Sequence, residues 1–355
     1  MSHDEPNGHA SASYFSVDEL PQNDRFEIWE ASMGCMFDID VTPELRANFR
    51  ASVQSHIVGD LMMSHTQTTA HTFNRQSYQL AKNGLTHYLV QWFEKGTIHF
   101  ENGQDSHQLQ SGEILICDLA RPTYCHTTNF ADYTMVVPRN MIEDALDDPD
   151  DHHMRILPAS SPLSTIIRQC IVAPLSKNGS MTPKIGQDIS KIFIDTLTRH
   201  LNTVATHPQD ESLHHHLGKR RAIQSYIELN LHDSRLSPTT IAKEFGMSRS
   251  KLYQMFEHTE GIANIIRQKR LEKSLAMILQ PSDHKPSIYD IAWDCGFSND
   301  VSFIRAFRQH FHIPPGYLRN RIAETNSPWS KAGAENGEGF DQWILRLQSQ
   351  GPNQL

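Results

Sequence analysis

Two short stretches in the C-terminal third of the chain carry side chains suited to contacting DNA bases. Helical projection of residues 300–308 places Phe303 and Phe307 on one face and leaves Val301 and Arg305 on the other. In a major groove an arginine can bond guanine O6 and N7, and an apolar side chain beside it can contact a thymine methyl group. The outward residues predicted in this way are Ser250, Tyr253 and Gln254 in the first stretch and Val301, Ser302, Arg305 and Arg308 in the second.

The elements that must position these residues are two helix-turn-helix units. The stretches 236–256 and 287–307 share one plan, in which a helix ends at Phe-Gly or Cys-Gly and a second helix begins near a Ser or Asn that can cap it. Aligning Ile241 with Ile291 gives a repeat offset of 50 residues, with one residue slipping in the second turn. Between them, residues 261–279 predict an amphipathic helix. It would hold the units about one DNA turn, roughly 34 Å, apart, so that both second helices enter successive major grooves.

The distribution of charge supports this interpretation. Residues 219–323 contain 16 Lys and Arg against 10 Asp and Glu, a net charge of +6, whereas residues 1–218 contain 14 against 27, a net charge of -13. A basic segment joined to an acidic one is typical of a DNA-binding module attached to a domain whose partner is not a polyanion. One such unit alone could equally be a helical hairpin in an all-helical core. Two units in one basic segment favour DNA binding.

Residues that match the pattern of a known protein family occur in both units and continue beyond the second. They are Ile241-Ala242, Gly246-Met247-Ser248, Leu252, Phe256, Gly261, Arg270-Leu271-Glu272, Ile291-Ala292, Gly296-Phe297, Phe303-Ile304-Arg305-Ala306-Phe307 and the run from Ile313 to Arg319. In these residues the segment resembles the C-terminal DNA-binding domain of the AraC/XylS family of transcriptional regulators. The resemblance implies that the base-reading positions are Ser250, Tyr253, Gln254, Asp300, Val301, Ser302 and Arg305.

Basic residues of the same segment are expected to contact DNA phosphates, which supply affinity without sequence information. The candidates are Lys219, Arg220, Arg249, Lys251, Lys285 and Arg308.

The acidic N-terminal part predicts a sheet-rich domain. Phe26, Trp29 and Met33 follow helical spacing within 21–37, and short stretches rich in Val, Ile, Thr and aromatic residues then alternate with turns from about 47 to 137. These predict a sandwich or barrel, with Asn102-Gly103 as a hairpin turn. Helical patterns resume at about 139–146, 160–176 and 184–204.

This order of elements is similar to the effector-binding, cupin-like domain of one branch of the same family. The matching pieces are Leu20-Pro21, Arg25-Phe26, Trp29, Gly112-Glu113-Ile114-Leu115-Ile116 and Ala120-Arg121-Pro122. The resemblance implies that the barrel interior holds a small effector and that the helices at 160–176 and 184–204 mediate dimerisation. The predicted fold class is α+β, with an N-terminal cupin-like β-barrel and flanking helices followed by an all-α domain with two helix-turn-helix units.

The expected organisation has four parts. A cupin-like effector-binding and dimerisation domain spans 13–204, a linker 205–218, the AraC-type DNA-binding domain 219–323, and a C-terminal tail 324–355. Within the DNA-binding domain the two units are expected at 236–257 and 287–310.

The barrel residues do not predict a metal centre. Metal-dependent cupins bring two His and a Glu onto one ion, usually with His-x-His in the first motif. No His-x-His occurs among the barrel histidines His56, His65, His71, His87, His99, His107 and His126. No catalytic residue, metal or cofactor is therefore expected, and no effector-binding residue is assigned.

Two further groups of side chains are of types that can bind a metal or undergo redox chemistry. The run His214-His215-His216 is expected to be a solvated spacer rather than a metal ligand. Cys117 and Cys125 lie on strands that could be neighbours, where they would be either a redox switch or, more commonly, buried inert thiols.

The resulting prediction is a cytoplasmic, sequence-specific transcription regulator and not an enzyme. The polar N-terminus is unlike a signal peptide, and no run of about 18 apolar residues could cross a membrane. Its expected partners are double-stranded promoter DNA, an unidentified small-molecule effector, RNA polymerase if it is an activator, and a second copy as a homodimer. Two alternatives stay open: a metal-dependent cupin enzyme fused to a DNA-binding domain, and an architectural DNA binder without effector control.

Overall fold

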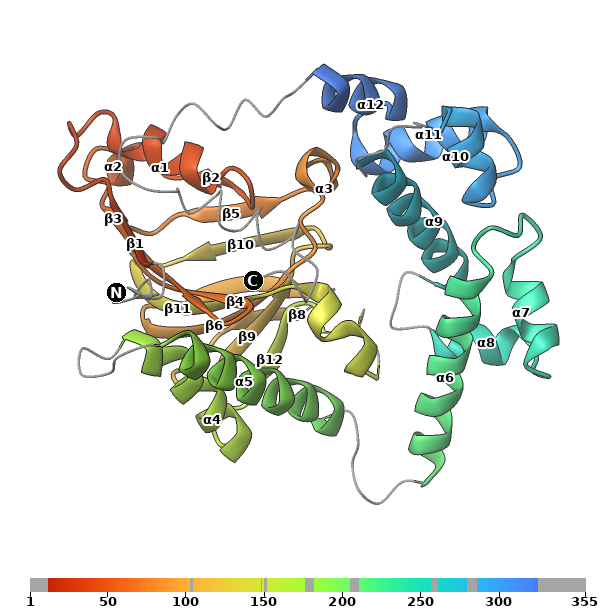
Figure 1. The fold of residues 1–355 in the computed structure, drawn as a ribbon, viewed down its shortest axis with the longest axis horizontal. Coiled ribbons are helices and arrows are strands. Elements are labelled where there is room, and N and C mark those ends of the chain that lie inside the picture. The colour runs from red at the N-terminus through yellow and green to blue at the C-terminus, as the bar shows by residue number, and fades with distance from the viewer. Residues whose placement is uncertain are drawn as a thin grey trace, which may run out of the picture. The chain divides into compact units, whose positions relative to one another are not determined.

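A computed structural model describes residues 12–102, 105–147, 149, 152–175, 182–204, 211–256, 261–279 and 286–324. They form two compact units (Figure 1). The first contains the described residues from Ala12 to Val204 apart from Leu80–Gly84, and the second contains the helices from Glu211 onwards. The predicted C-terminal tail lies outside the described residues after Glu324.

The first unit is built around two antiparallel sheets. The seven-stranded sheet has the order β1 (Ala12–Ser16), β3 (Ala51–Val58), β4 (Leu61–Thr68), β11 (Phe130–Val137), β6 (Tyr88–Lys95), β9 (Ile114–Asp118) and β12 (Arg155–Leu157). The five-stranded sheet has the order β2 (Asp38–Asp40), β5 (Thr72–Arg75), β10 (Thr123–Thr127), β7 (Ile98–Asn102) and β8 (Asp105–Gln108). The sheets share one apolar core, which confirms the predicted cupin-like barrel.

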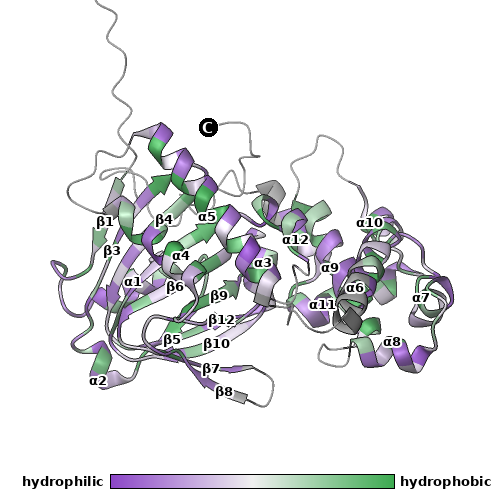
Figure 2. Ribbon diagram, turned by 90° about the horizontal axis from the view of Figure 1, so that it is seen from below, coloured by the Kyte–Doolittle hydropathy of each residue, from purple (hydrophilic) through white to green (hydrophobic). Residues whose placement is uncertain are grey.

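The central strands of the seven-stranded sheet are buried on both faces, and this explains the nearly continuous apolar runs of β9 and β11. Leu89 points into the core shared by the two sheets, whereas its neighbour Val90 points to the opposite face. That opposite face is covered by α4 (Pro162–Val172) and α5 (Pro183–Val204), which contribute Ile167 and Phe193. In Figure 2 the outlying strands β7 and β8 are, by contrast, largely hydrophilic.

Shorter helices complete this unit. Helix α1 (Arg25–Met33) buries Phe26, Trp29 and Met33, as the spacing predicted, although it is shorter than the predicted range 21–37. Helix α2 (Pro43–Arg46) lies in the connection between β2 and β3. Helix α3 (Ser77–Asn83) follows β5 and belongs to the second unit from Leu80 onwards. The helix predicted at 139–146 is instead a pair of 3-10 turns, η1 (Arg139–Met141) and η2 (Glu143–Ala145). The backbone leaves the helical conformation at Ile142, whose side chain is buried in the core beneath α5.

The second unit is all helical. Its elements are α6 (Glu211–Leu229), α7 (Pro238–Glu244), α8 (Arg249–Met255), α9 (Ile262–Leu279), α10 (Ile288–Asp294), α11 (Asp300–Phe311) and α12 (Pro315–Glu324). The pairs α7–α8 and α10–α11 are the two predicted helix-turn-helix units. Helix α6 begins inside the stretch 205–218 that was expected to be linker, and Pro208 is the last proline before it. The α+β fold class is confirmed.

Candidate DNA-binding surface

Each helix-turn-helix unit opens with a capped first helix. The Ser237 hydroxyl accepts a hydrogen bond from the backbone N–H of Thr240, and the Thr240 side chain accepts one from the backbone N–H of Ser237. Ser287 and Asp290 form the same reciprocal capping box at the start of α10. The two boxes lie 50 residues apart, which is the repeat offset predicted from the sequence.

The turns that follow also correspond. Gly246 and Gly296 have φ angles of +58° and +72°, a region that glycine adopts without strain. The second helices are then capped by Ser248 and Asn299, whose side chains each accept from the backbone N–H three residues further on. The offset between the caps is 51 residues rather than 50, so the one-residue slip lies in the second turn, as predicted.

Helix α8 packs on the core through one face and exposes the predicted base-reading residues on the other. Leu252 is fully buried in the core of the first helix-turn-helix unit. The side chains of Ser250, Tyr253 and Gln254 are exposed, and the ring of Tyr253 lies 6.0 Å from the Arg249 guanidinium. All three predicted positions are therefore accessible on one short helix.

Helix α11 shows the same division more strongly. Phe303 and Phe307 are fully buried, whereas Val301 is 71% exposed and Arg305 is exposed. A valine this exposed has no packing role in the unit, and contact with a thymine methyl group would give it one.

Two of the predicted base-reading residues in α11 already form hydrogen bonds at the start of the helix. The Ser302 hydroxyl donates to the backbone carbonyl of Asn299 at 2.9 Å, and half-buried Asp300 accepts from the backbone N–H of Val301. These contacts stabilise the start of the helix, so a base contact by either side chain would have to replace or share them.

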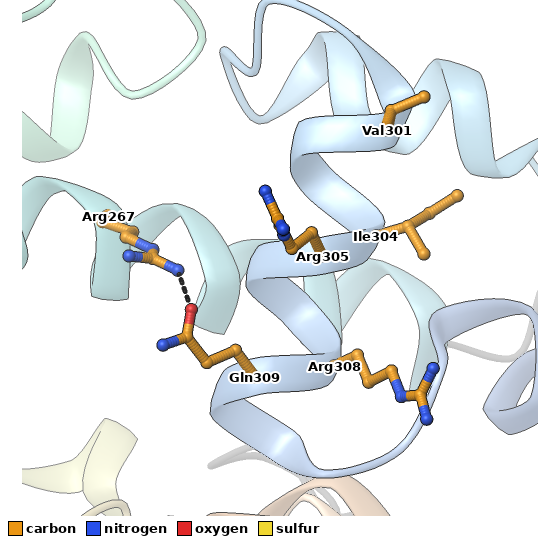
Figure 3. Close-up of a pocket in the computed structure, with 6 residues that line it drawn as sticks. All are labelled: Arg267, Val301, Ile304, Arg305, Arg308 and Gln309. Carbon is orange, nitrogen blue, oxygen red and sulfur yellow. Dashed lines mark hydrogen bonds between the residues drawn. The ribbon is translucent and has the colours of Figure 1, made fainter.

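A hollow on the surface of the second unit joins α11 to α9. It is lined by Arg267, Val301, Ile304, Arg305, Arg308 and Gln309. Figure 3 shows Val301, Ile304 and Arg308 projecting from one side of α11 and Arg305 extending toward α9. There the Arg267 guanidinium donates to the Gln309 side chain at 2.9 Å.

Three residues of this hollow were missed in the sequence: Arg267, Ile304 and Gln309. Ile304 is 38% exposed, and the helical projection that singled out Val301 could also have found it. Arg267 belongs to the connecting helix, and its position beside α11 follows only from tertiary packing.

Helix α9 belongs to the cores of both helix-turn-helix units. Its N-terminal half contributes Ile262 and Ile266 to the core beneath α7 and α8. Its C-terminal half contributes Leu271 and Leu275 to the core beneath α10 and α11. One continuous helix therefore fixes α8 and α11 relative to each other.

The predicted phosphate-contacting residues differ in their surroundings. Arg249, Lys251 and Arg308 are exposed, whereas Lys219 is half-buried. The Arg220 guanidinium lies 5.4 Å from the centre of the Phe256 ring, which ties it to the core of the first unit. Lys285 lies outside the described residues.

Cys117 and Cys125 are both buried but lie on different sheets, β9 and β10, so they are not on neighbouring strands as the sequence suggested. Burial raises the pKa of the Cys117 thiol to about 12 and also raises that of Cys125, so both remain protonated at neutral pH. The side chains of His214, His215 and His216 lie outside the described residues.

Among the described residues, no group of three or more His, Cys, Asp or Glu side chains could hold a metal ion. None of the described helices is long and apolar enough to span a membrane.

Comparison with known proteins covers both units. Residues 32–188 match the model of the AraC-binding-like domain, and residues 241–321 match that of a helix-turn-helix domain. The transcriptional activator NphR of Rhodococcus sp is 24% identical over 306 residues, which cover 84% of this chain and 90% of NphR. The regulatory protein SoxS of Salmonella typhimurium is 33% identical over 110 residues, which cover 30% of this chain and all of SoxS.

A solved structure is similar over most of the chain. The crystal structure of the AraC-like transcriptional activator CuxR superimposes with a TM-score of 0.50 and 25% identity, covering 74% of this chain and 94% of CuxR.

A sensor-type barrel joined to two helix-turn-helix units defines a one-component transcription regulator. The chain belongs to the AraC family of transcriptional regulators, with an effector-binding domain of the AraC-binding-like type and a helix-turn-helix DNA-binding domain.

Proposed function

We propose that the protein is an effector-responsive activator that inserts α8 and α11 into successive major grooves on one face of promoter DNA. The observation that carries this proposal is the shared helix α9, whose two halves lie in the cores of the two units. Its 18 residues span about 27 Å, a length compatible with readers one DNA turn apart. Two similar proteins, NphR and CuxR, are named as transcriptional activators, which supports activation rather than repression.

Base reading is assigned to the exposed faces of the two second helices. In this proposal Ser250, Tyr253, Gln254, Asp300, Val301, Ser302 and Arg305 read bases, while Lys219, Arg220, Arg249, Lys251, Lys285 and Arg308 bind phosphates. The main specificity determinants of α11 in this proposal are Arg305 and Val301, because both side chains are exposed. Ser302 contributes less, because its hydroxyl already donates to the Asn299 carbonyl.

The domain roles follow from the two units. Residues 13–204 would bind the effector and dimerise, and residues 219–323 would bind DNA, with the connection lying between Val204 at the end of α5 and Glu211 at the start of α6. The protein would act in the cytoplasm, where promoter DNA and RNA polymerase are found, without catalysing a reaction.

Exposed apolar residues on α4 and α5 support the homodimer. Ile166 on α4 and Ile185 and Ile192 on α5 are each more than two-fifths exposed. Ile185 and Ile192 are seven residues apart and therefore share a helix face. Ile192→Glu is expected to shift the protein from dimer to monomer in sedimentation analysis, whereas Lys191→Glu on the same helix is not. Unchanged mass for Ile192→Glu would place the interface elsewhere.

Methylation interference tests the docking of both helices. Methyl groups on guanine N7 project into the major groove, so those that block binding mark where the protein enters it. The proposal expects two clusters of interfering guanines about 10 base pairs apart on one face of the duplex. A single cluster would show that only one unit reads bases. Interference with no preferred sequence would favour the architectural binder, and metal analysis of the purified protein tests the fused cupin enzyme.

A further inference from the structure

Polar side chains form a continuous row across the inner face of the seven-stranded sheet. Ser55 of β3 pairs with Ser64 of β4, Ser64 pairs with Thr134 of β11, and Thr134 pairs with Gln91 of β6. Alternate residues of a strand share a face, and the alternating neighbours Met62, Leu89 and Val136 belong to the core between the two sheets. The polar row therefore lies inside the barrel, in an otherwise apolar core.

The next row contains a buried acid. Asp132 pairs with Thr66 and is 3% exposed. Its carboxylate accepts from the Thr134 hydroxyl at 2.7 Å and from the Gln91 amide at 3.3 Å, with a further hydrogen bond from Thr66. The strand pairing between β11 and β6 shifts register at this residue, a type of irregularity that re-aims side chains and is frequent next to binding sites.

Asp132 has only neutral partners. Burial raises the pKa of its carboxyl group to about 6, so it is mostly ionised at neutral pH. Among the described residues it makes no ion pair. A buried carboxylate held only by hydroxyl and amide groups is a strong remaining acceptor for a ligand that brings hydrogen-bond donors.

A second buried acceptor lies at the adjoining end of the core. His71 is 4% exposed, and its Nδ1 lies 2.7 Å from the carbonyl oxygen of Thr69, a contact in which Nδ1 must donate. Desolvation lowers its pKa to about 4, so the ring is neutral at neutral pH. Nε2 is then an acceptor, and it is buried without a hydrogen-bond partner among the described residues.

Aromatic side chains connect the two acceptors along the core. The His71 ring centre lies 4.4 Å from that of Phe73 and 5.8 Å from that of Phe130. Phe130 precedes Asp132 by two residues on β11, which is about 7 Å on the same face. Thr66 and Gln91, which face this interior, are only half-buried.

We infer that the effector of this domain is a small alcohol or amine, held by the Asp132 carboxylate and His71 Nε2 against the rings of Phe73 and Phe130. The inference rests on the proposed function, which makes the first unit the effector-binding domain. Both polar anchors accept hydrogen bonds, so the ligand must supply O–H or N–H donors. A carboxylic acid is disfavoured, because its anion would lie against the carboxylate of Asp132.

Three matched compounds test the inference on the intact protein. Benzyl alcohol, benzylamine and benzoate share one ring and differ only in the polar group. Thermal unfolding and calorimetric titration at pH 7.5 should show binding of benzyl alcohol or benzylamine, and benzoate should bind at least about tenfold more weakly. A preference for benzyl alcohol or for benzylamine shows which of the two compound classes the site takes. Benzoate binding as well as the better of the other two, or no binding by either donor compound, would overturn the inference.

Variants then locate the site. Benzylamine has N–H donors for both acceptors, so Asp132→Asn and His71→Phe should each weaken its binding by about tenfold. Benzyl alcohol has one O–H donor, so only the variant of the acceptor that it contacts should weaken its binding. Asp144→Asn, at an exposed position of η2 in the same unit, is the matched control and should leave affinity unchanged. Unchanged affinity in both interior variants would place the ligand elsewhere. If either variant fails to fold, the comparison of the three compounds on the native protein still decides.

DNA binding separates this inference from the proposed function. Failure of the ligand assignment would leave site-specific DNA binding intact, with a response to some other class of compound. Failure of the proposed function would appear as loss of any preferred DNA site, whatever the compounds do.

Discussion

Arg305→Ala should relax base choice at one position of the DNA site while leaving binding to scrambled DNA almost unchanged. Arg305 is exposed on α11 and lines the same surface hollow as Val301 and Ile304. A bidentate contact with guanine is worth about 1–3 kcal/mol, so the loss on the selected site should be roughly 5- to 150-fold. Fluorescence anisotropy with a labelled duplex measures it directly, with each base pair of the site varied in turn.

Two variants separate base reading from charge. Arg305→Lys keeps the positive charge but cannot form the two parallel bonds, so it should lose nearly as much specificity as alanine. Lys251→Ala, at an exposed position of α8, should weaken selected and scrambled DNA alike and reduce the salt-dependence slope by about 0.9. Equal losses on selected and scrambled DNA for Arg305→Ala would refute its assignment as a base reader.

The remaining predictions concern the framework. A methyl group added at Gly296 would overlap the carbonyl oxygen of Leu231, whereas one added at Gly246 meets nothing within 4 Å. Gly246→Ala should therefore cost only the left-handed strain of about 1–2 kcal/mol, and Gly296→Ala clearly more, in urea unfolding. Equal costs would contradict the different packing of the two turns. Asn299→Ala removes the cap of α11 and should cost about 1 kcal/mol of unfolding free energy, with specific DNA affinity falling as the helix start frays. Asp132 ionises near pH 6 in the folded protein and near 3.8 when unfolded, so its ionisation lowers stability progressively as pH rises through this window. The unfolding free energy of Asp132→Asn relative to the native protein should then rise by about 3 kcal/mol between pH 3 and pH 7, and a flat difference would contradict the raised pKa.

The helical unit could be predicted well because its helix boundaries and buried faces depend on residues close together in the sequence. Capping residues, positive-φ glycines and the spacing of Phe303, Ala306 and Phe307 determine where each helix starts and which face it buries. The same signals recur 50 residues apart, so each unit supported the interpretation of the other.

The barrel was predicted only in outline because its short strands depend on distant partners. β5 (Thr72–Arg75) has no apolar alternation, yet it is paired between β2 and β10. Its Arg75 is 1% exposed and donates to the backbone carbonyls of Leu119, Met36 and Leu85. No local pattern indicates that a charged residue will be buried against three carbonyl groups from separate segments.

The candidate DNA-binding and effector sites also differ in how far local sequence patterns could predict them. The outward positions of α8 and α11 follow from helical periodicity, and their exposure agrees with it. Arg267 beside α11 and the polar row inside the barrel depend on how elements pack, so neither could be found from spacing. Twenty-one histidines gave no reason to single out His71 until the structure showed its buried Nε2 among aromatic rings.

Selection of bound sequences from a random DNA pool tests the central claim most directly. The intact protein would be used at near-physiological salt, so that phosphate attraction alone does not dominate. Two reading helices fixed by α9 predict an enriched site with two short half-elements about one helical turn apart. If the intact protein shows no enrichment, the fragment 217–323 is selected in the same way, which separates a DNA-binding unit held inactive without effector from one that cannot read DNA. Failure of both to enrich any site, or enrichment of a single half-element only, would contradict the claim that two helix-turn-helix units read DNA together.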